Sequence, residues 1–244
     1  MNEKKVKDLM LPLEEYAQIS SEATIEDAKG RIMAHATTRC VIQDVPFDPD
    51  APLSEPTPPI TDPPDPYLRE VPDGLQLDLS IWDGQRRIDV QRTLGRDNPG
   101  PVNALTGLVF DHVRPGAVAL TLPASPWFSN GTPFAYGGLL AWACDSSLVG
   151  AIWTTLDAGA VAPSLDLQVR FIRPVPVDGS TLDITAQVIH SGRSLRVAQA
   201  EVTNAEGKVV AIASGSSLVI EDGMDRLVAG GRVDQIVNDG TDID

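Results

Sequence analysis

A continuous apolar segment with one carboxylate near its middle constrains the fold of this chain more than any other stretch. The segment begins at Gly137 and Gly138, after a loop rich in glycine and proline, and reaches about Trp153. It is marginal in length for a membrane span and is interrupted by polar residues at 145–147, so we expect a buried central helix wrapped by a sheet. The first backbone N–H groups of such a helix, and the positive end of its dipole, would face an anion or a polarised carbonyl.

Asp145 lies about two turns inside this expected helix. Aspartate is rarely buried without a partner. Two interpretations therefore stay open: Asp145 is a structural hydrogen-bonding group, or it is a working acid–base group.

Composition and charge exclude some classes of partner. The formal net charge of −15 argues against nucleic acid, because phosphate binding needs clustered lysine and arginine. The N-terminal sequence is mixed and charged, without the apolar core of a signal peptide. Cys40 and Cys144 lie far apart, and we interpret both as reduced thiols. These features predict a cytoplasmic protein that does not associate with a membrane.

Residues 1–43 are expected to form a small unit. Thr24 fits the N-cap of a helix with Asp27 at its third position, and the helix should run to about His35. The sequences at 6–12 (Val-Lys-Asp-Leu-Met-Leu-Pro) and 23–28 (Ala-Thr-Ile-Glu-Asp-Ala) resemble the opening of a cystathionine-β-synthase (CBS) type ligand-binding motif. That resemblance implies adenosyl-nucleotide binding, and with it nucleotide regulation of the rest of the chain. Three other interpretations of the fragment stay open: a relic, a fusion scar or a small docking element.

The next two regions lead to the main domain. Residues 46–72 contain ten of the chain's 20 prolines, which predicts a semi-extended linker over 44–73 rather than helix or sheet. Residues 74–104 are expected to be a helical or irregular lead-in. Leu75 and Leu79 fit both an alternating strand and one face of a helix, and we favour a helix that packs on the main domain.

Residues 105–221 show the pattern of an α+β domain. One long apolar helix is combined with about five antiparallel strands, so the sheet should curl round the helix. The predicted strands, separated by turn signals, are residues 118–122, 165–173, 181–190, 195–204 and 209–220. In the second of these, Leu165, Leu167, Val169 and Phe171 should share one face. Residues 222–244 are expected to be a solvated acidic tail.

A set of features occurs in a fixed order over about 115 residues of this domain. These are Asn130, the Gly137-Gly138 pair, Asp145, the segment 164–174, Gly192-Arg193-Ser194-Leu195, and the Ala-Ser-Gly-Ser sequence around Gly215. Through these features the segment from about 105 to 220 resembles a single hotdog domain of the phenylacetate-pathway type of acyl-CoA thioesterase, within the 4-hydroxybenzoyl-CoA thioesterase superfamily. The resemblance implies a curled antiparallel sheet wrapped around one long central helix.

The resemblance also implies roles in thioester hydrolysis without a metal or other cofactor. Asp145 would act as general base or nucleophile, and the backbone N–H of Gly137 would polarise the thioester carbonyl. Asn130 would hold the attacking water or the carbonyl, and the hydroxyl of Ser164 would orient the water or the carboxylate. Gly192 and Arg193 fall where the family places a turn near the CoA phosphates, and Gly138 would contact the substrate. Structural interpretations also stay open: Ser164 begins a strand, Arg193 is a solvated turn residue, and Asn130 shapes its loop.

One position departs from the family pattern. The residue before the glycine pair is usually histidine in this family, whereas this chain has Tyr136. A phenol still donates a hydrogen bond, so Tyr136 stays a candidate catalytic residue, in a pocket of different shape and pH response. The competing interpretation is a non-catalytic acyl-CoA or acyl-carrier binding module.

The spacing of the candidate residues predicts the oligomeric state. Gly137 and Asp145 are eight residues apart, or about 12 Å along a helix axis. One thioester carbon has to lie about 3 Å from both its attacking group and its oxyanion donors. We therefore expect a site across a two-fold interface, with Asn130 and Gly137 from one protomer and Asp145 and Ser164 from the other. A homodimer, or a homotetramer built as a dimer of dimers, would satisfy this.

Overall fold

The computed structural model describes residues 17–26, 32–42, 86–93 and 100–223. The chain divides into two units, residues 1–63 and 64–244. The proline-rich linker, most of the lead-in and nearly all of the acidic tail predicted from the sequence lie outside the described residues. Among the residues described, no helix is both long enough and apolar enough to cross a membrane.

The described part of the N-terminal unit is an antiparallel hairpin of β1 (Ala17–Glu26) and β2 (Ile32–Ile42). The predicted helix from Thr24 to about His35 is wrong, because Thr24 lies in β1 and is the cross-strand partner of His35 in β2. Both strands are rich in β-branched residues, which favour extended backbone over helix. The helix prediction gave more weight to a capping pattern than to this composition.

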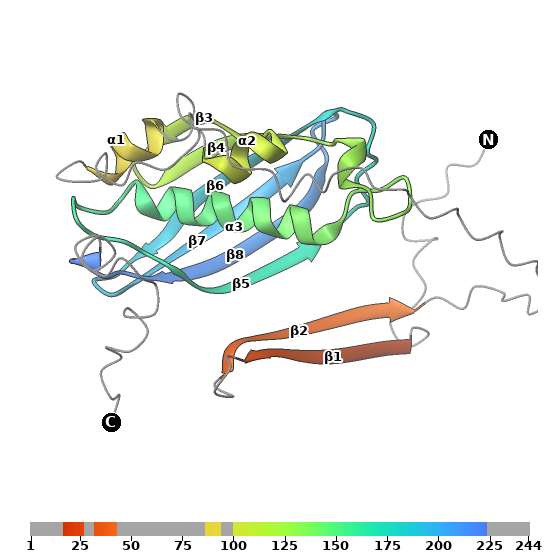
Figure 1. The fold of residues 1–244 in the computed structure, drawn as a ribbon, viewed down its shortest axis with the longest axis horizontal. Helices are drawn as coiled ribbons and strands as arrows, with labels where there is room; N and C mark the ends of the chain where they lie inside the picture. The colour runs from red at the N-terminus through yellow and green to blue at the C-terminus, as the bar shows by residue number, and fades with distance from the viewer. Residues whose placement is uncertain (1–16, 27–31, 43–85, 94–99, 224–244) are drawn as a thin grey trace, which may run out of the picture. The chain divides into compact units, whose positions relative to one another are not determined.

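The second unit contains a six-stranded antiparallel sheet with one long helix across its face (Figure 1). The strand order is β3-β4-β6-β7-β8-β5. The strands are β3 (Val109–Arg114), β4 (Ala117–Pro123), β5 (Ser164–Phe171), β6 (Thr181–Ser191), β7 (Leu195–Thr203) and β8 (Val209–Leu218). The helix is α3 (Gly137–Trp153), which begins and ends where the sequence predicts. This arrangement is the predicted curled sheet with a central helix.

The core lies between α3 and the middle strands of the sheet. Alternate residues of β4 and β6, among them Leu120 and Ile184, are buried against helix residues such as Leu148 and Ile152. The opposite face of the sheet carries the polar residues of the same strands, as expected for an antiparallel sheet with one solvated side. The side of α3 that faces the sheet is buried, whereas its other side, which includes Trp142 and Asp145, is only partly covered.

β5 is one edge of the sheet, and the register fixes the direction of its side chains. Leu167, Val169 and Phe171 pair with Gly215, Ala213 and Ala211 of β8, all buried beneath α3. From Leu167 onward the predicted apolar face of β5 therefore points to the helix side, as expected. Leu165, which was predicted on the same face, lies at a register shift between Ser164 and Asp166. This face is only partly covered, however: Leu165 is 56% exposed, Leu167 39% and Phe171 55%.

β3 is the other edge strand of the sheet, and it was not predicted from the sequence. The register between β3 and β4 shifts between Phe110 and His112, so a β-bulge breaks the alternation of apolar residues that identifies a strand. The short helix α1 (Arg87–Arg92) packs against β3 and α3. Arg92 donates a hydrogen bond from Nη2 to the carbonyl oxygen of Val113 in β3 at 3.4 Å. Within the expected lead-in, residues 87–92 are helical, and a second short helix, α2 (Pro101–Thr106), follows. Leu75 and Leu79, on which the predicted lead-in helix rested, lie outside the described residues.

The absence of a side chain at Gly215 allows three elements to meet. A Cβ added at this position of β8 would lie 2.7 Å from the carbonyl oxygen of Asp166 in β5. It would also lie 3.2 Å from Cδ1 of Leu148 in α3. β5 and α3 therefore approach β8 more closely than any side chain at position 215 would allow.

Candidate functional site

Asp145 and Ser164 form the centre of the candidate site. The hydroxyl of Ser164, the first residue of β5, donates a hydrogen bond to Oδ1 of Asp145 at 2.8 Å. Asp145 is half-buried on the side of α3 that faces β5, and Ser164 is exposed. The structure thus brings together two residues that lie 19 positions apart in the sequence and were predicted to share a site.

The neighbouring Cys144 shows how differently the two sides of α3 are solvated. Its thiol is fully buried against the sheet. Burial, and to a lesser extent the negative charge of Asp145, raises the pKa of Cys144 to about 12. The carboxylate of Asp145 therefore lies beside a dry, neutral thiol on one side and an open sheet edge on the other.

The N-terminus of α3 carries the second group of predicted residues. Tyr136 is the N-cap residue, and its side chain makes no capping hydrogen bond. The first N–H groups of a helix lack partners within the helix, so those of Gly137 and Gly138 point out of the helix end. Phe171, at the end of β5, packs on Gly137: its Cζ lies 3.2 Å from the position that a Cβ there would occupy.

Asn130 lies in the loop before α3, where its side chain shapes the backbone. Its Oδ1 accepts a hydrogen bond from the backbone N–H of Thr132 at 3.1 Å and another from the Thr132 hydroxyl. The backbone N–H of Asn130 bonds the carbonyl of Phe134. These contacts correspond to the loop-shaping interpretation, and they hold the residue near the start of α3.

Gly192 and Arg193 lie at the opposite end of α3. They form the turn between β6 and β7, where the N–H of Gly192 bonds the carbonyl of Leu195 at 2.9 Å. Arg193 lines a hollow of about 310 Å³ together with Arg196, Asp157 and Glu221. Arg196 bonds the carbonyl oxygen of Thr155 at 3.1 Å, just beyond the C-terminus of α3. The structure therefore does not bring this turn together with Tyr136 and Gly137 within one chain.

Within one chain the candidate site is in two halves. Gly137 and Asp145 are eight residues apart on the same regular helix, which separates them by about 12 Å along its axis. Each half lies beside β5, with Phe171 against Gly137 and Ser164 against Asp145. Both halves therefore lie along the same open edge of the sheet.

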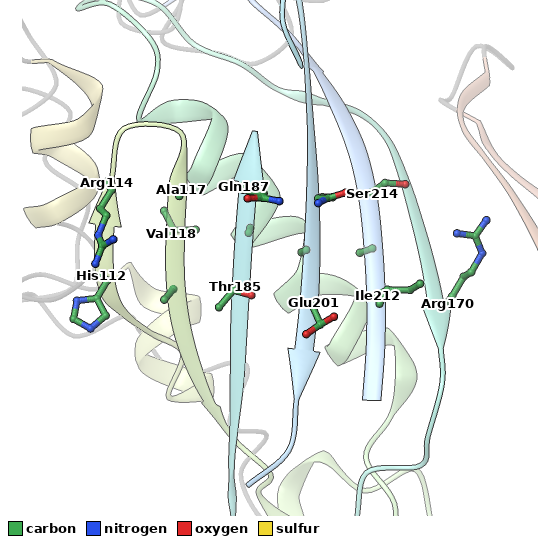
Figure 2. A pocket seen from close by; sticks show the side chains of 15 residues that line it. His112, Arg114, Ala117, Val118, Arg170, Thr185, Gln187, Glu201, Ile212 and Ser214 are labelled. Carbon is green, nitrogen blue, oxygen red and sulfur yellow. The ribbon is translucent and has the colours of Figure 1, made fainter. Parts of the chain in front are cut away.

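A trough on the face of the sheet opposite α3 was not predicted from the sequence. It measures about 690 Å³, and its polar side chains lie on the side of the sheet opposite α3 (Figure 2). Arg114 and His112 on β3 form one rim, Arg170 on β5 forms the other, and Glu201 lies between them. Five strand spacings of about 4.8 Å separate the rims, so the trough is a broad surface rather than an enclosed pocket. The sequence feature that could have indicated this trough is the row of outward polar residues on β6 and β7. No predicted site residue lines the trough.

Among the described residues, no group of three or more histidine, cysteine or acidic side chains could hold a metal ion.

Comparison with known proteins agrees with this architecture. Residues 133–211 match the family model of the thioesterase superfamily. No curated protein matches the sequence significantly.

Three solved structures illustrate the similarity. A thioesterase from Haemophilus influenzae shares 16% identity over 60% of this chain and 93% of its own, with a TM-score of 0.49. The PaaI protein from the phenylacetic acid degradation operon of E. coli shares 25% identity over 59% of this chain and 96% of its own, with a TM-score of 0.49. A hypothetical thioesterase from Streptococcus pneumoniae, solved with coenzyme A, shares 23% identity over 46% and 87% of the two chains, with a TM-score of 0.43.

Proposed function

Because residues 133–211 lie in a hotdog domain of the thioesterase superfamily, as the sequence predicts, we propose that the protein hydrolyses acyl-CoA thioesters to the free acid and CoA. The superfamily match supports a thioester hydrolase in general, and the acyl-CoA substrate is the proposal. The observation that carries it is the hydrogen bond between Ser164 and Asp145 at an open sheet edge. A half-buried carboxylate held by a hydroxyl, in reach of solvent, is suited to activate water.

The proposed site is completed by a second copy of the chain. The free side of β5 pairs with no strand in the described part of the chain. Leu165, Leu167 and Phe171 of this strand are exposed although they are apolar, and so is Ile172, which follows the strand. An unprotected apolar edge strand favours pairing with another chain. A two-fold axis beside β5 would place the helix N-terminus of one copy opposite the carboxylate of the other.

The proposed reaction uses groups from both copies. Asp145 acts as general base towards water, or as the nucleophile itself, and Ser164 orients the carboxylate or the water. The N–H of Gly137 from the partner copy donates a hydrogen bond to the thioester oxygen and stabilises the negative charge that develops there. Asn130 and Tyr136 stand at the same helix end as further donors. Gly138 borders the substrate at the helix start. Gly192 and Arg193 are proposed to contact CoA, with Arg193 offsetting the repulsion between an acidic protein and an anionic substrate.

Thiol release from a panel of acyl-CoAs tests the proposal. The purified full-length chain should release free CoA from at least one straight-chain or aryl thioester, followed with a thiol-reactive dye. Reactions without protein give the background rate. Binding of the same esters without thiol release would favour the non-catalytic acyl-CoA or acyl-carrier module, and neither binding nor release would rule out both.

A further inference from the structure

β5 contains one residue more than the part of β8 that it pairs with. Asp166 lies opposite Ser216, whereas Ser164, two residues earlier, lies opposite Ser217, the very next residue of β8. The chain keeps this shifted pairing at the isolated bridge three residues before Ser164. Leu165 is therefore the extra residue of a β-bulge, and its side chain is 56% exposed.

This extra residue decides which way the hydroxyl of Ser164 points. From Leu167 onward, alternate residues of β5 face α3, opposite glycine and alanine residues of β8. In a regular strand the next residue on that side would be Leu165, and Ser164 would point to the opposite face of the sheet. The bulge instead places Ser164 opposite Ser217, whose side chain is buried (1% exposed). The Ser164 hydroxyl thereby reaches the carboxylate of Asp145 on the helix side.

Asp166, directly after the extra residue, is held against β8 in two ways. Its Oδ2 accepts a hydrogen bond from the hydroxyl of Ser216, its cross-strand partner. Its carbonyl oxygen lies 2.7 Å from the position that a Cβ on Gly215 would occupy, so the backbones approach closely. Because Asp166 alternates with Leu167, its side chain points away from α3. Its influence on the site therefore passes through the backbone of β5.

We propose that Asp166 is a positioning residue: together with Ser216 it holds the β-bulge at Leu165, and the bulge turns the Ser164 hydroxyl towards Asp145. This inference rests on the proposed thioesterase function, in which Ser164 orients the carboxylate or the water. β-Bulges beside reacting groups re-aim single side chains in this way. Since Asp166 touches no reacting atom, its effect on the rate should not exceed that of Ser164 itself.

The test measures kcat by thiol release in two backgrounds, the wild type and Ser164→Ala. Asp166→Ala removes the hydrogen-bond acceptor and should lower kcat about two- to fivefold with little change in KM. In the Ser164→Ala background the same substitution should lower kcat no further, because the hydroxyl that it positions is gone. Asp166→Asn keeps an acceptor for Ser216 and should retain most of the rate.

Two further variants serve as a second route and as a control. Ser216→Ala removes the same hydrogen bond from the β8 side and should match Asp166→Ala, and the double variant should be no slower than either. Gln168→Ala removes a polar side chain from the same face of β5, two residues beyond Asp166, and should leave kcat unchanged. Melting temperatures report folding. If Asp166→Ala does not fold, Ser216→Ala leaves the sequence of β5 intact and takes its place in both backgrounds.

The outcomes separate this inference from the proposed function. An unchanged kcat in Asp166→Ala and Ser216→Ala overturns the inference while hydrolysis stands. An equal loss in the Ser164→Ala background also overturns it, because Asp166 would then act independently of Ser164. If the wild type hydrolyses no ester, crystal structures of the wild type and Asp166→Ala decide. Loss of the Ser164–Asp145 hydrogen bond in the variant alone supports the positioning role, and the same Ser164 geometry in both proteins overturns it.

Discussion

The two edge strands of the six-stranded sheet differ in the features that keep a further strand from pairing with them. β3 is short and bulged, α1 packs against it, and Arg92 of that helix bonds one of its carbonyl groups. β5 is longer and presents apolar side chains that α3 only partly covers. Bulges, covering helices and charged groups are the devices by which proteins stop a sheet from growing. β3 combines all three. β5 also has a register shift, between Ser164 and Asp166, and a charged Arg170, but its leucines are exposed.

This difference indicates that the sheet is closed at one edge and open at the other. The Ser164–Asp145 pair and the helix N-terminus both lie along the open edge. The proposed chemistry and the proposed association therefore depend on the same strand. The first three of the following predictions test whether β5 is a functional edge, and the last tests the covered side of α3 as the contrast.

The largest effect is expected for Asp145→Asn. Asparagine keeps the shape of the side chain and its bond to Ser164 but cannot accept a proton, so kcat should fall by about 10²- to 10⁴-fold. Thiol release at saturating substrate measures this, with the melting temperature as a control for folding. Unchanged turnover would remove Asp145 from the mechanism.

Introducing a charged residue into each edge strand compares β5 with β3 directly. Leu167 on β5 and Val109 on β3 are both 39% exposed, so Leu167→Glu and Val109→Glu are matched substitutions. Leu167→Glu should convert a dimer to a monomer and lower kcat/KM at least about tenfold, because a buried glutamate at the interface has no partner. Val109→Glu should change neither. Light scattering after size exclusion gives the mass, and equal behaviour of the two variants would contradict the comparison.

Ser164→Ala should have a smaller effect on activity. It removes the 2.8 Å hydrogen bond to the carboxylate without changing the backbone of β5. An exposed hydrogen bond to a charged group contributes about 1 kcal/mol, so kcat should fall roughly fivefold. Ser164→Thr keeps a hydroxyl and should restore part of the rate. A rate equal to wild type in Ser164→Ala would assign Ser164 a purely structural role at the start of β5.

The smallest effect concerns the covered side of α3. The pKa of the Cys144 thiol is raised from 9.0 to about 12 in the folded protein, so below pH 9 both the folded and the unfolded state keep the proton. Between pH 9 and 12 only the unfolded state loses it, which lowers the free energy of unfolding, by about 1 kcal/mol at pH 10. Cys144→Ala should remove this part of the alkaline loss. Urea unfolding of both proteins at pH 7 and pH 10 measures the difference, and an identical pH dependence would show that the thiol is not shielded.

The sequence predicted the parts of the fold that repeat a simple pattern. The helix from Gly137 to Trp153 and the strands β4 to β8 were found close to their predicted bounds, because apolar runs and alternation reflect burial directly. β3 was missed because its bulge shifts Asp111 out of the alternation. The helix predicted from Thr24 was wrong because local capping signals compete with β-branched composition, and strand pairing decided the outcome.

The site was predictable only in part. The family resemblance implied site roles for Asp145 and Ser164, and the fold brings the two residues into contact. The contact between Tyr136 and Gly138 could not be foreseen, because it depends on how one ring folds back on the helix. The exposure of the apolar face of β5 could not be predicted either. The alternation of apolar residues shows which residues share a face but not what covers that face.

The missing side chain at Gly215 has a consequence for how this protein can change. Its two close neighbours are Asp166, two residues beyond Ser164, and Leu148, about one helical turn beyond Asp145. A single added methyl group would wedge the edge strand and the helix apart, and the distance between hydroxyl and carboxylate would grow with that gap. A substitution at Gly215, which touches no reacting atom, could therefore abolish the proposed activity as effectively as the loss of Asp145.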